Sequence, residues 1–166
     1  MSRGFVKEED QEEPLIVPPR AALPEGVTNY VTPNGLAELK QELKELEHQR
    51  AHVEAENETE KRRSQSLIDG KINLLAERLQ SARLLDPKEQ PGDEVRFGAI
   101  VELQNLTSNQ KQEFQIVGVD EADIKKKKIA FVAPIAKAVT GKKVGEETDF
   151  KLGNEVRKLK ILKISY

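Results

Sequence analysis

Two stretches between residues 32 and 86 carry apolar residues at alternating steps of three and four. The first contains Leu36, Leu39, Leu43 and Leu46, and the second contains Ile68, Ile72, Leu75, Leu79 and Ala82. This spacing is typical of the narrow apolar seam of a coiled-coil helix. We predict that the first helix begins at Thr32-Pro33, because threonine caps helices and proline suits their first position. It is expected to run to about Ala55, a length of about 35 Å.

The two predicted helices fit together as an antiparallel hairpin. When Leu36 is paired with Leu79 and Leu46 with Ile68, the paired position numbers have a nearly constant sum, as an antiparallel pair requires. Half of that sum places the turn at about residue 57. Asn57 stands there, and asparagine tolerates the left-handed backbone conformation that a tight turn between helices often needs.

The predicted outer end of the hairpin is polar and acidic. Arg50, Lys61 and Gln65 fall on seam positions, so we expect an ordered base and a mobile tip. The glutamates that surround the turn are Glu54, Glu56, Glu58 and Glu60. Of these, Glu54, Glu56 and Glu58 are candidate ligands that can help hold Mg²⁺ from one side when another molecule supplies the remaining ligands. A solvated helical turn of mixed charge is the alternative interpretation.

Beyond the hairpin the apolar pattern changes to the short period of β-strands. Asp86-Pro87 is expected to end the second helix, because the residue before a proline is driven out of helical geometry. The predicted strands are 99–103, 113–119, 129–131, 150–152 and 156–166, with a short helix over 134–140. We therefore predict an α+β protein, with an N-terminal antiparallel coiled-coil hairpin and a C-terminal small antiparallel sheet with a short helix.

Residues 1–30 are expected to be an extension without a core of its own. An acidic run is followed by Pro14, Pro18, Pro19 and Pro24, which disfavour helix and favour extended backbone. A flexible, loosely draped arm and an arm docked on the C-terminal domain or on a partner both fit this composition. The predicted organisation is an extension over 1–30, a coiled coil over 31–86, a linker over 87–94 and a sheet domain over 95–166.

Composition excludes several classes of function. The 166 residues include no cysteine, so disulfides and thiol nucleophiles are excluded. No phosphate-binding loop, hydrolase motif or zinc-protease motif is present, and His48 and His52, four residues apart, are interpreted as solvent-facing. No apolar run approaches the ~20 residues that span a bilayer, and residues 1–11 lack the apolar core of a signal peptide. We expect a soluble cytoplasmic protein with no membrane partner.

Several short segments occur in a specific order. They are TPNGL at 32–36, FGAIV at 97–101, IVG at 116–118 with EAD at 121–123, PIAKA at 134–138, GKKVGE at 141–146 and the closing strand at 161–166. Together, these segments resemble the Gre transcription elongation factors (GreA and GreB) of bacteria. The resemblance covers about residues 31–166 and implies an FKBP-like C-terminal domain carrying the coiled coil.

The resemblance also implies a partner, RNA polymerase, and a role in elongation. The C-terminal domain would dock at the mouth of the polymerase secondary channel, and the hairpin would enter the channel. The implied docking residues are Val132, Ala133, Pro134 and Ile135, with Glu121 and Asp123. Tip carboxylates would help hold a second Mg²⁺ while the polymerase active site cuts backtracked RNA. The chain would then be a monomer and no enzyme, with no intrinsic cofactor or metal, and would meet nucleic acid only within the transcription complex.

Two departures from the family pattern bear on this role. Glu56-Asn57 matches part of the family's tip motif, but His52-Val53 stands where its Gly-Asp pair would be. The arms also look about two heptads shorter, which is roughly 20 Å, so the length favours a non-cleaving or weakly cleaving regulator. In addition, Val132-Ala133 precedes Pro134, where family members commonly have Asp-Ser.

Two other classes of function are left open. One is an FKBP-like prolyl isomerase or chaperone module. Five phenylalanines, two tyrosines and no tryptophan are few for an aromatic-lined proline pocket. The other is a structural coiled-coil adaptor, against which the short seam with its polar outer end argues.

Overall fold

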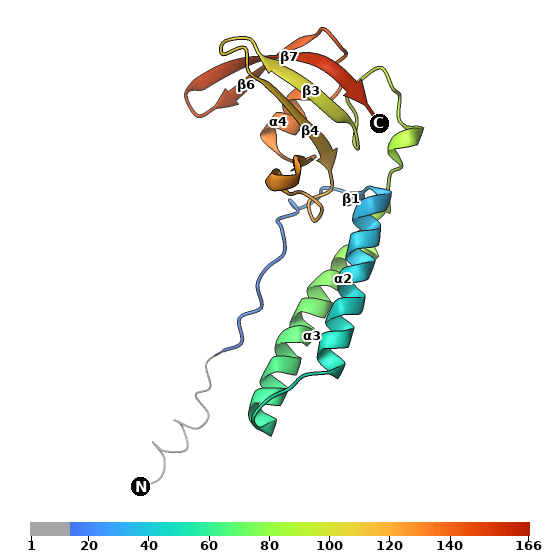
Figure 1. Cartoon of the computed structure of the whole chain (residues 1–166), viewed down its shortest axis with the longest axis vertical. Coiled ribbons are helices and arrows are strands. Elements are labelled where there is room, and N and C mark those ends of the chain that lie inside the picture. The colour runs from blue at the N-terminus through green and yellow to red at the C-terminus, as the bar shows by residue number, and fades with distance from the viewer. Residues whose placement is uncertain (1–13) are drawn as a thin grey trace.

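The structure, a computed structural model, describes residues 14–166 of the chain. Its elements are β1 (Tyr30–Val31), α2 (Pro33–Ala51), α3 (Glu58–Ser81), β2 (Arg83–Leu84), η1 (Pro87–Glu89), β3 (Ile100–Asn105), β4 (Lys111–Val117), η2 (Ile124–Lys126), β5 (Lys128–Ala130), α4 (Pro134–Val139), β6 (Glu147–Leu152) and β7 (Glu155–Ser165). A long helical hairpin projects from a small domain built on a curled sheet (Figure 1). The predicted α+β class, with its hairpin and sheet domain, is confirmed.

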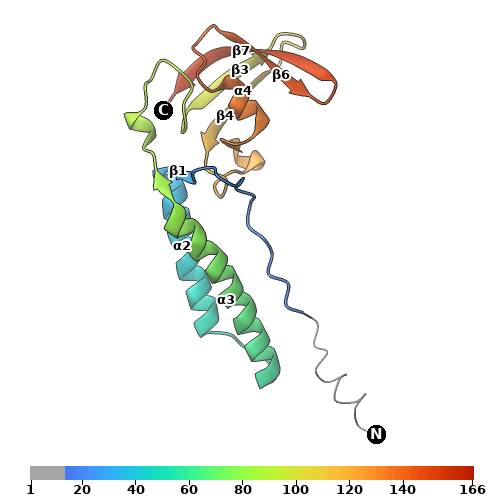
Figure 2. The same cartoon turned by 180° about the vertical axis from the view of Figure 1, so that it is seen from behind.

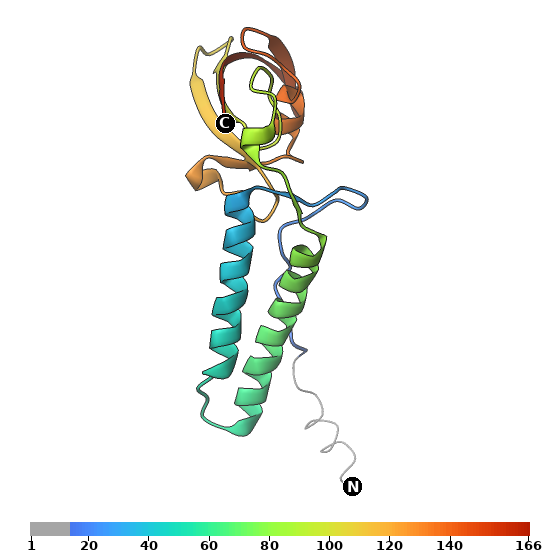
Figure 3. The ribbon, with the colours of Figure 1, turned by 90° about the vertical axis from the view of Figure 1, so that its right-hand side faces the viewer.

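The apolar seam holds the hairpin together as predicted. Figure 3 shows α2 and α3 side by side from the domain to the tip. Their buried cluster contains Val31, Leu39, Leu46 and Leu75, with Leu36, Leu43, Ile68, Ile72, Leu79 and Ala82 packed against it. The hydroxyl of Thr32 accepts a hydrogen bond from the Gly35 N–H, which confirms the predicted cap. With 19 residues, α2 is about 28 Å long, shorter than predicted because it ends at Ala51.

The second helix ends before the predicted Asp86-Pro87 break. It stops at Ser81, because the chain then forms the short strand β2, which pairs in parallel with β1. Asn29, just before β1, donates from its side-chain amide to the Arg78 carbonyl and the Ser81 hydroxyl in the last turn of the helix. Pairing with a distant segment therefore sets this end of the hairpin.

Five strands form the sheet of the C-terminal domain, in the order β5-β4-β3-β7-β6. All neighbours are antiparallel except β4 and β5, which are parallel, so the wholly antiparallel sheet predicted is corrected at this edge. The segment between these two strands, residues 118–127, crosses over and returns the chain in the same direction. β6 begins at Glu147 rather than at residue 150, because its pairing with β7 continues to Lys160.

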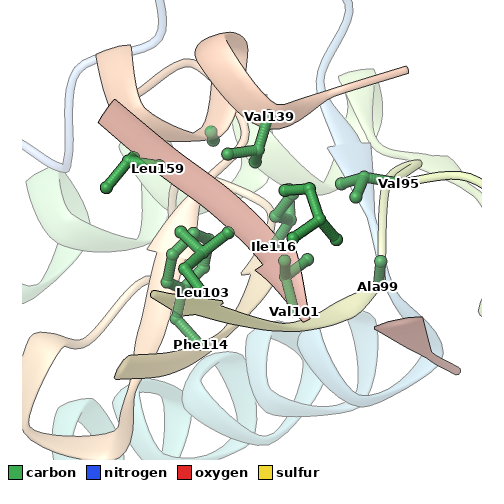
Figure 4. Packing of buried hydrophobic residues seen from close by; sticks show 10 residues of the cluster. Val95, Ala99, Val101, Leu103, Phe114, Ile116, Val139 and Leu159 are labelled. Carbon is green, nitrogen blue, oxygen red and sulfur yellow. The ribbon is translucent and has the colours of Figure 1, made fainter. Parts of the chain in front are cut away.

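The curled sheet wraps around a core that α4 closes from one side (Figures 2 and 4). The most deeply buried side chains of this core include Val95, Val101, Leu103, Ile116 and Ile161 from the sheet, with Ala136 and Val139 from the helix. Within residues 14–166, no helix is both long enough and apolar enough to cross a membrane.

Candidate functional site

The tip of the hairpin is a six-residue connection followed by the capped start of α3. Asn57 is the N-cap of α3, and its side-chain oxygen accepts a hydrogen bond from the Glu60 N–H at 2.9 Å. The turn lies where the pairing of the helices places it, but the backbone of Asn57 is extended, with φ −149°, so the left-handed conformation expected at Asn57 is wrong. The physical reason is that asparagine serves here as a helix cap. Glu58 and Glu60 lie in the first turn of α3, where the helix dipole favours negative charge.

The three predicted tip carboxylates are exposed to solvent. Glu54 and Glu56 lie in the connection and Glu58 begins α3. Across residues 14–166, no three His, Cys, Asp or Glu side chains are grouped so that they could hold a metal ion. The exposed pair His48 and His52 stacks ring against ring with centroids 4.1 Å apart, which agrees with solvent-facing histidines. The tip therefore offers exposed carboxylates, which suit a metal ion only when a partner supplies further ligands.

An ion pair joins α2 to α3 near the tip, where the sequence predicts polar residues on the seam. Arg50 donates from Nε and a terminal nitrogen to the two carboxylate oxygens of Asp69, at 2.5 and 3.2 Å. This two-point geometry fixes both planar groups relative to each other. The hydrogen bond and the positive charge of Arg50 lower the pKa of Asp69 below its ordinary value of 3.8. The sequence signal was Arg50 on a seam position, but seam periodicity does not specify which polar side chain of the facing helix an arginine will reach.

Replacing Asp69 with Asn is expected to remove a pH-dependent part of the hairpin stability. Because the folded pKa of Asp69 is lowered, this contribution is present above pH 3.8 and is lost as the pH falls through the lower folded pKa. Denaturation of the wild-type chain and of Asp69→Asn, measured between pH 7 and pH 2, should converge at the acid end. A stability difference that is the same at every pH would contradict the role of this ion pair.

The predicted docking segment forms the start of α4 and the turn before it. Ala133 is the N-cap of α4 and makes no side-chain capping bond, and Pro134 occupies the first turn. Pro134 is exposed, whereas Val132, Ala133 and Ile135 are half-buried. This segment therefore presents an apolar face without a charged side chain of its own.

Beside this segment lies a hollow of about 530 Å³ with aromatic walls. Phe97 and Phe131 lie edge to face at 5.6 Å, and Tyr30 lies 6.0 and 5.7 Å from them. Val132 lines the same hollow, and so do the cationic residues Arg96 and Lys137. The sequence did not predict this hollow, because seven aromatic residues are few for an aromatic-lined pocket, but folding brings three of them together.

Glu121 joins the hairpin to the sheet domain. Its side chain is 3% exposed, and its carboxylate accepts hydrogen bonds from the Thr32 hydroxyl at 2.5 Å, the Asn34 amide at 2.9 Å and Lys128 Nζ at 3.1 Å. Gly35 permits this approach, since a Cβ there would lie 2.8 Å from the Glu121 carboxylate. Both carboxylate oxygens are thus used within the chain, which leaves the docking role predicted for Glu121 without a free carboxylate.

Asp123 shapes the loop that carries it. Its side chain accepts a hydrogen bond from the Lys125 N–H at 3.0 Å and caps η2. Lys127 follows in left-handed geometry, with φ 58°, and Lys128 then returns to the sheet. The structure thus gives Asp123 a capping role, and Asp123 does not line the aromatic hollow, whereas Val132 does.

The fold and the site define a two-part protein, in which a helical rod with free carboxylates at its tip is carried by a sheet domain with an apolar hollow. By sequence, the chain belongs to the GreA/GreB family of transcription elongation factors. The family model described as "Transcription elongation factor, GreA/GreB, C-term" matches residues 90–166.

Full-length relatives establish this membership across both parts. The transcription elongation factor GreA of Thermodesulfovibrio yellowstonii is 34% identical over 151 residues, covering 82% of this chain and 96% of that protein. GreA of Rhodospirillum rubrum is 37% identical over 136 residues, covering 73% of this chain and 87% of that protein. The alignment with the first relative has 151 positions but includes only 82% of the 166 residues of this chain. About 15 residues of that relative therefore have no counterpart in this chain.

The chain is also similar to solved structures at low sequence identity. A GreA/GreB factor from Nitrosomonas europaea matches with a TM-score of 0.41 at 20% identity, covering 84% of this chain and 99% of that one. The GreA factor homolog Gfh1 of Thermus thermophilus matches with a TM-score of 0.40 at 20% identity, covering 84% of this chain and 100% of that one.

Proposed function

We propose that this chain binds RNA polymerase at the mouth of the secondary channel and regulates transcription elongation. The C-terminal domain docks through the face formed by Val132 and the aromatic hollow, and the hairpin enters the channel. Family membership, shared with GreA proteins over most of the chain, is the observation that carries this proposal. The chain acts as a monomer in the cytoplasm, is not itself an enzyme, and meets nucleic acid only within the transcription complex.

The tip geometry supports a regulator that does not strongly stimulate transcript cleavage. Glu54, Glu56 and Glu58 are the ligand type that Mg²⁺ prefers, but they are exposed and belong to no group of three side chains in residues 14–166 that could hold a metal ion. Any Mg²⁺ at the tip would therefore be shared with the polymerase, with most ligands supplied from outside this chain. The residues missing relative to a GreA protein would, if all lay in the hairpin, shorten each arm by about one heptad, or roughly 10 Å, which is half the shortening expected from the sequence.

A transcript-cleavage assay on backtracked complexes of the cognate polymerase tests this function. We expect the wild-type chain to bind these complexes while the cleavage rate stays within about twofold of the polymerase alone, which is less than 1 kcal/mol in barrier height. A variant with Glu54, Glu56 and Glu58 changed to Ala should give the same rate. Glu47→Ala, an exposed glutamate on α2, is the matched control.

Two results of this assay would contradict the proposal. Strong stimulation by the wild type that is lost in the triple variant, but kept in Glu47→Ala, would identify a cleavage factor. Failure of the wild-type chain to bind the polymerase at all would reject the secondary-channel role.

The aromatic hollow favours a second candidate function, prolyl isomerisation. Tyr30, Phe97 and Phe131 line a space of about 530 Å³, a size suited to a small apolar group. Tyr30 comes from the hairpin base, however, and already packs against both phenylalanines. An isomerase assay with the full chain and a proline peptide distinguishes the two functions, since elongation control requires no acceleration of isomerisation.

A further inference from the structure

The described part of the N-terminal extension lies against the hairpin and the sheet domain. We call residues 17–21 the strap. Figures 1 and 2 show this segment running beside the hairpin towards the domain. Its residues have contacts with α2, with α3 and with the loop after β4, as the three following observations show.

The first observation is a glycine notch on α3. A Cβ placed on Gly70 would lie 2.5 Å from one methyl carbon of Val17, and the three nearest heavy atoms all belong to Val17. Glycine is unfavourable inside a helix because it loses more conformational freedom than other residues. The glycine at this position is therefore explained by the strap that packs on it.

The second observation is an arginine shared between the two parts of the protein. Arg20 of the strap lies 3.0 Å from Asp120 of the sheet domain and 2.8 Å from Glu42 of α2. Although burial works against its charged form, the hydrogen bonds to Glu42 and Asp120 raise the pKa of Arg20. One guanidinium group thus connects the strap to the hairpin and to the domain.

The third observation ties the other helix to the same carboxylate. Arg78 of α3 donates to Asp120 at 3.3 Å and also to the backbone carbonyl of Ala21. The Asp120 side chain is only 6% exposed and receives both arginines. The strap, α3 and the domain therefore meet at the buried carboxylate of Asp120, and α2 joins them through the ion pair between Glu42 and Arg20.

From these contacts we infer that the strap fixes the angle between the hairpin and the sheet domain, with Arg20 as the positioning residue. A hairpin held at one angle has less orientational freedom to lose when the domain docks, so binding of a partner that receives both parts becomes tighter. The fixed angle is a property of the free chain. Its effect on polymerase binding rests on the proposed function.

Distances between spin labels test the angle directly, because the chain has no native cysteine to interfere. A pair at Thr59→Cys and Thr107→Cys reports the hairpin against the domain, and a pair at Ile16→Cys and Thr107→Cys reports the arm beside the strap. All three positions are exposed. With the wild-type strap, pulsed electron paramagnetic resonance should give one narrow distance distribution for each pair of labels.

Loss of the Arg20 side chain is expected to let the hairpin and the sheet domain move relative to each other. Arg20→Ala should increase the population outside the main hairpin–domain distance about tenfold, as expected when charge-assisted hydrogen bonds are lost. Arg83→Ala, a change at an exposed arginine of β2, is the matched control and should leave the distribution unchanged.

A substitution at Gly70 tests the role of the strap without removing a stabilising interaction of the helix. Gly70→Ala should displace the strap by its clash with Val17, although alanine is the better helix residue. Adding Val17→Ala removes the clashing methyl groups and leaves Cβ of residue 17 about 3.5 Å away, so the double variant should recover the narrow distribution.

Unchanged distance distributions in Arg20→Ala and in Gly70→Ala would overturn the inference. Broadened distributions together with weaker polymerase binding support it in full. Broadened distributions with unchanged polymerase binding confirm the positioning role in the free chain and count against the proposed function instead.

Discussion

Replacing Glu121 with Ala is expected to lower the free energy of unfolding of the full chain by about 2–4 kcal/mol. The change leaves Lys128, the Thr32 hydroxyl and the Asn34 amide without their shared acceptor at the junction of hairpin and domain. The Lys128 side chain is 21% exposed, so water compensates part of the loss. Chemical denaturation followed by circular dichroism measures this difference.

Two further variants sharpen this test. Glu113→Ala, at an exposed glutamate of β4, should change the unfolding free energy by less than about 0.5 kcal/mol. Glu121→Gln keeps one oxygen acceptor without the charge and should fall between the other two. A loss for Glu121→Ala no larger than that for Glu113→Ala would contradict the structural role of the carboxylate.

Changing Val132 to Asp is expected to weaken binding to RNA polymerase about 30-fold, the loss of an interface residue worth about 2 kcal/mol. Val132 is half-buried in the free chain and lines the aromatic hollow, so an unpaired carboxylate there would be buried at a docked interface. Titration of labelled polymerase with each variant measures the affinity.

The matched control for this prediction is Val156→Asp. Val156 is 53% exposed in β7, outside the hollow, and its replacement should leave the affinity within about twofold. Equal affinity of Val132→Asp and Val156→Asp for the polymerase would contradict the proposed docking face at Val132. Melting temperatures of both variants show whether a loss of affinity reflects unfolding.

Local patterns predicted the elements whose causes are local. The 3–4 spacing that includes Leu39, Leu46 and Leu75 specified the hairpin seam, and these three side chains are buried in the structure. The cap at Thr32 was predicted for the same reason, since its acceptor role involves a residue only three positions away. Short-range rules act on neighbouring residues, so one sequence contains the information they need.

The features that sequence reasoning missed depend on contacts between distant residues. α3 ends at Ser81 because β2 pairs with β1, and that pairing exists only once the hairpin has closed. Tyr30 reaches Phe97 and Phe131 from the segment assigned to the extension, and Gly118 makes room for its backbone carbonyl. Periodicity reports which face of an element is apolar, but not which distant element covers it.

In the candidate site, too, features with local causes could be predicted from the sequence, and features that depend on distant residues could not. The exposed carboxylates Glu54 and Glu56 could be predicted, since charged residues around a turn usually face solvent. The use of Glu121 inside the chain could not, because its acceptor role depends on Thr32 and Asn34, which lie far away in sequence. An acidic loop residue gives the same sequence signal whether it binds a partner or its own chain.

Photo-crosslinking from the hairpin tip tests the central claim most directly. A photoreactive phenylalanine analogue at Thr59, an exposed position in the first turn of α3, would be activated in a complex with the cognate RNA polymerase. We predict crosslinks to the polymerase segments that line the secondary channel, and their loss when Val132→Asp is combined with the probe. Crosslinks confined to the outer surface of the polymerase, or none in a complex that demonstrably forms, would contradict the proposed placement of the hairpin.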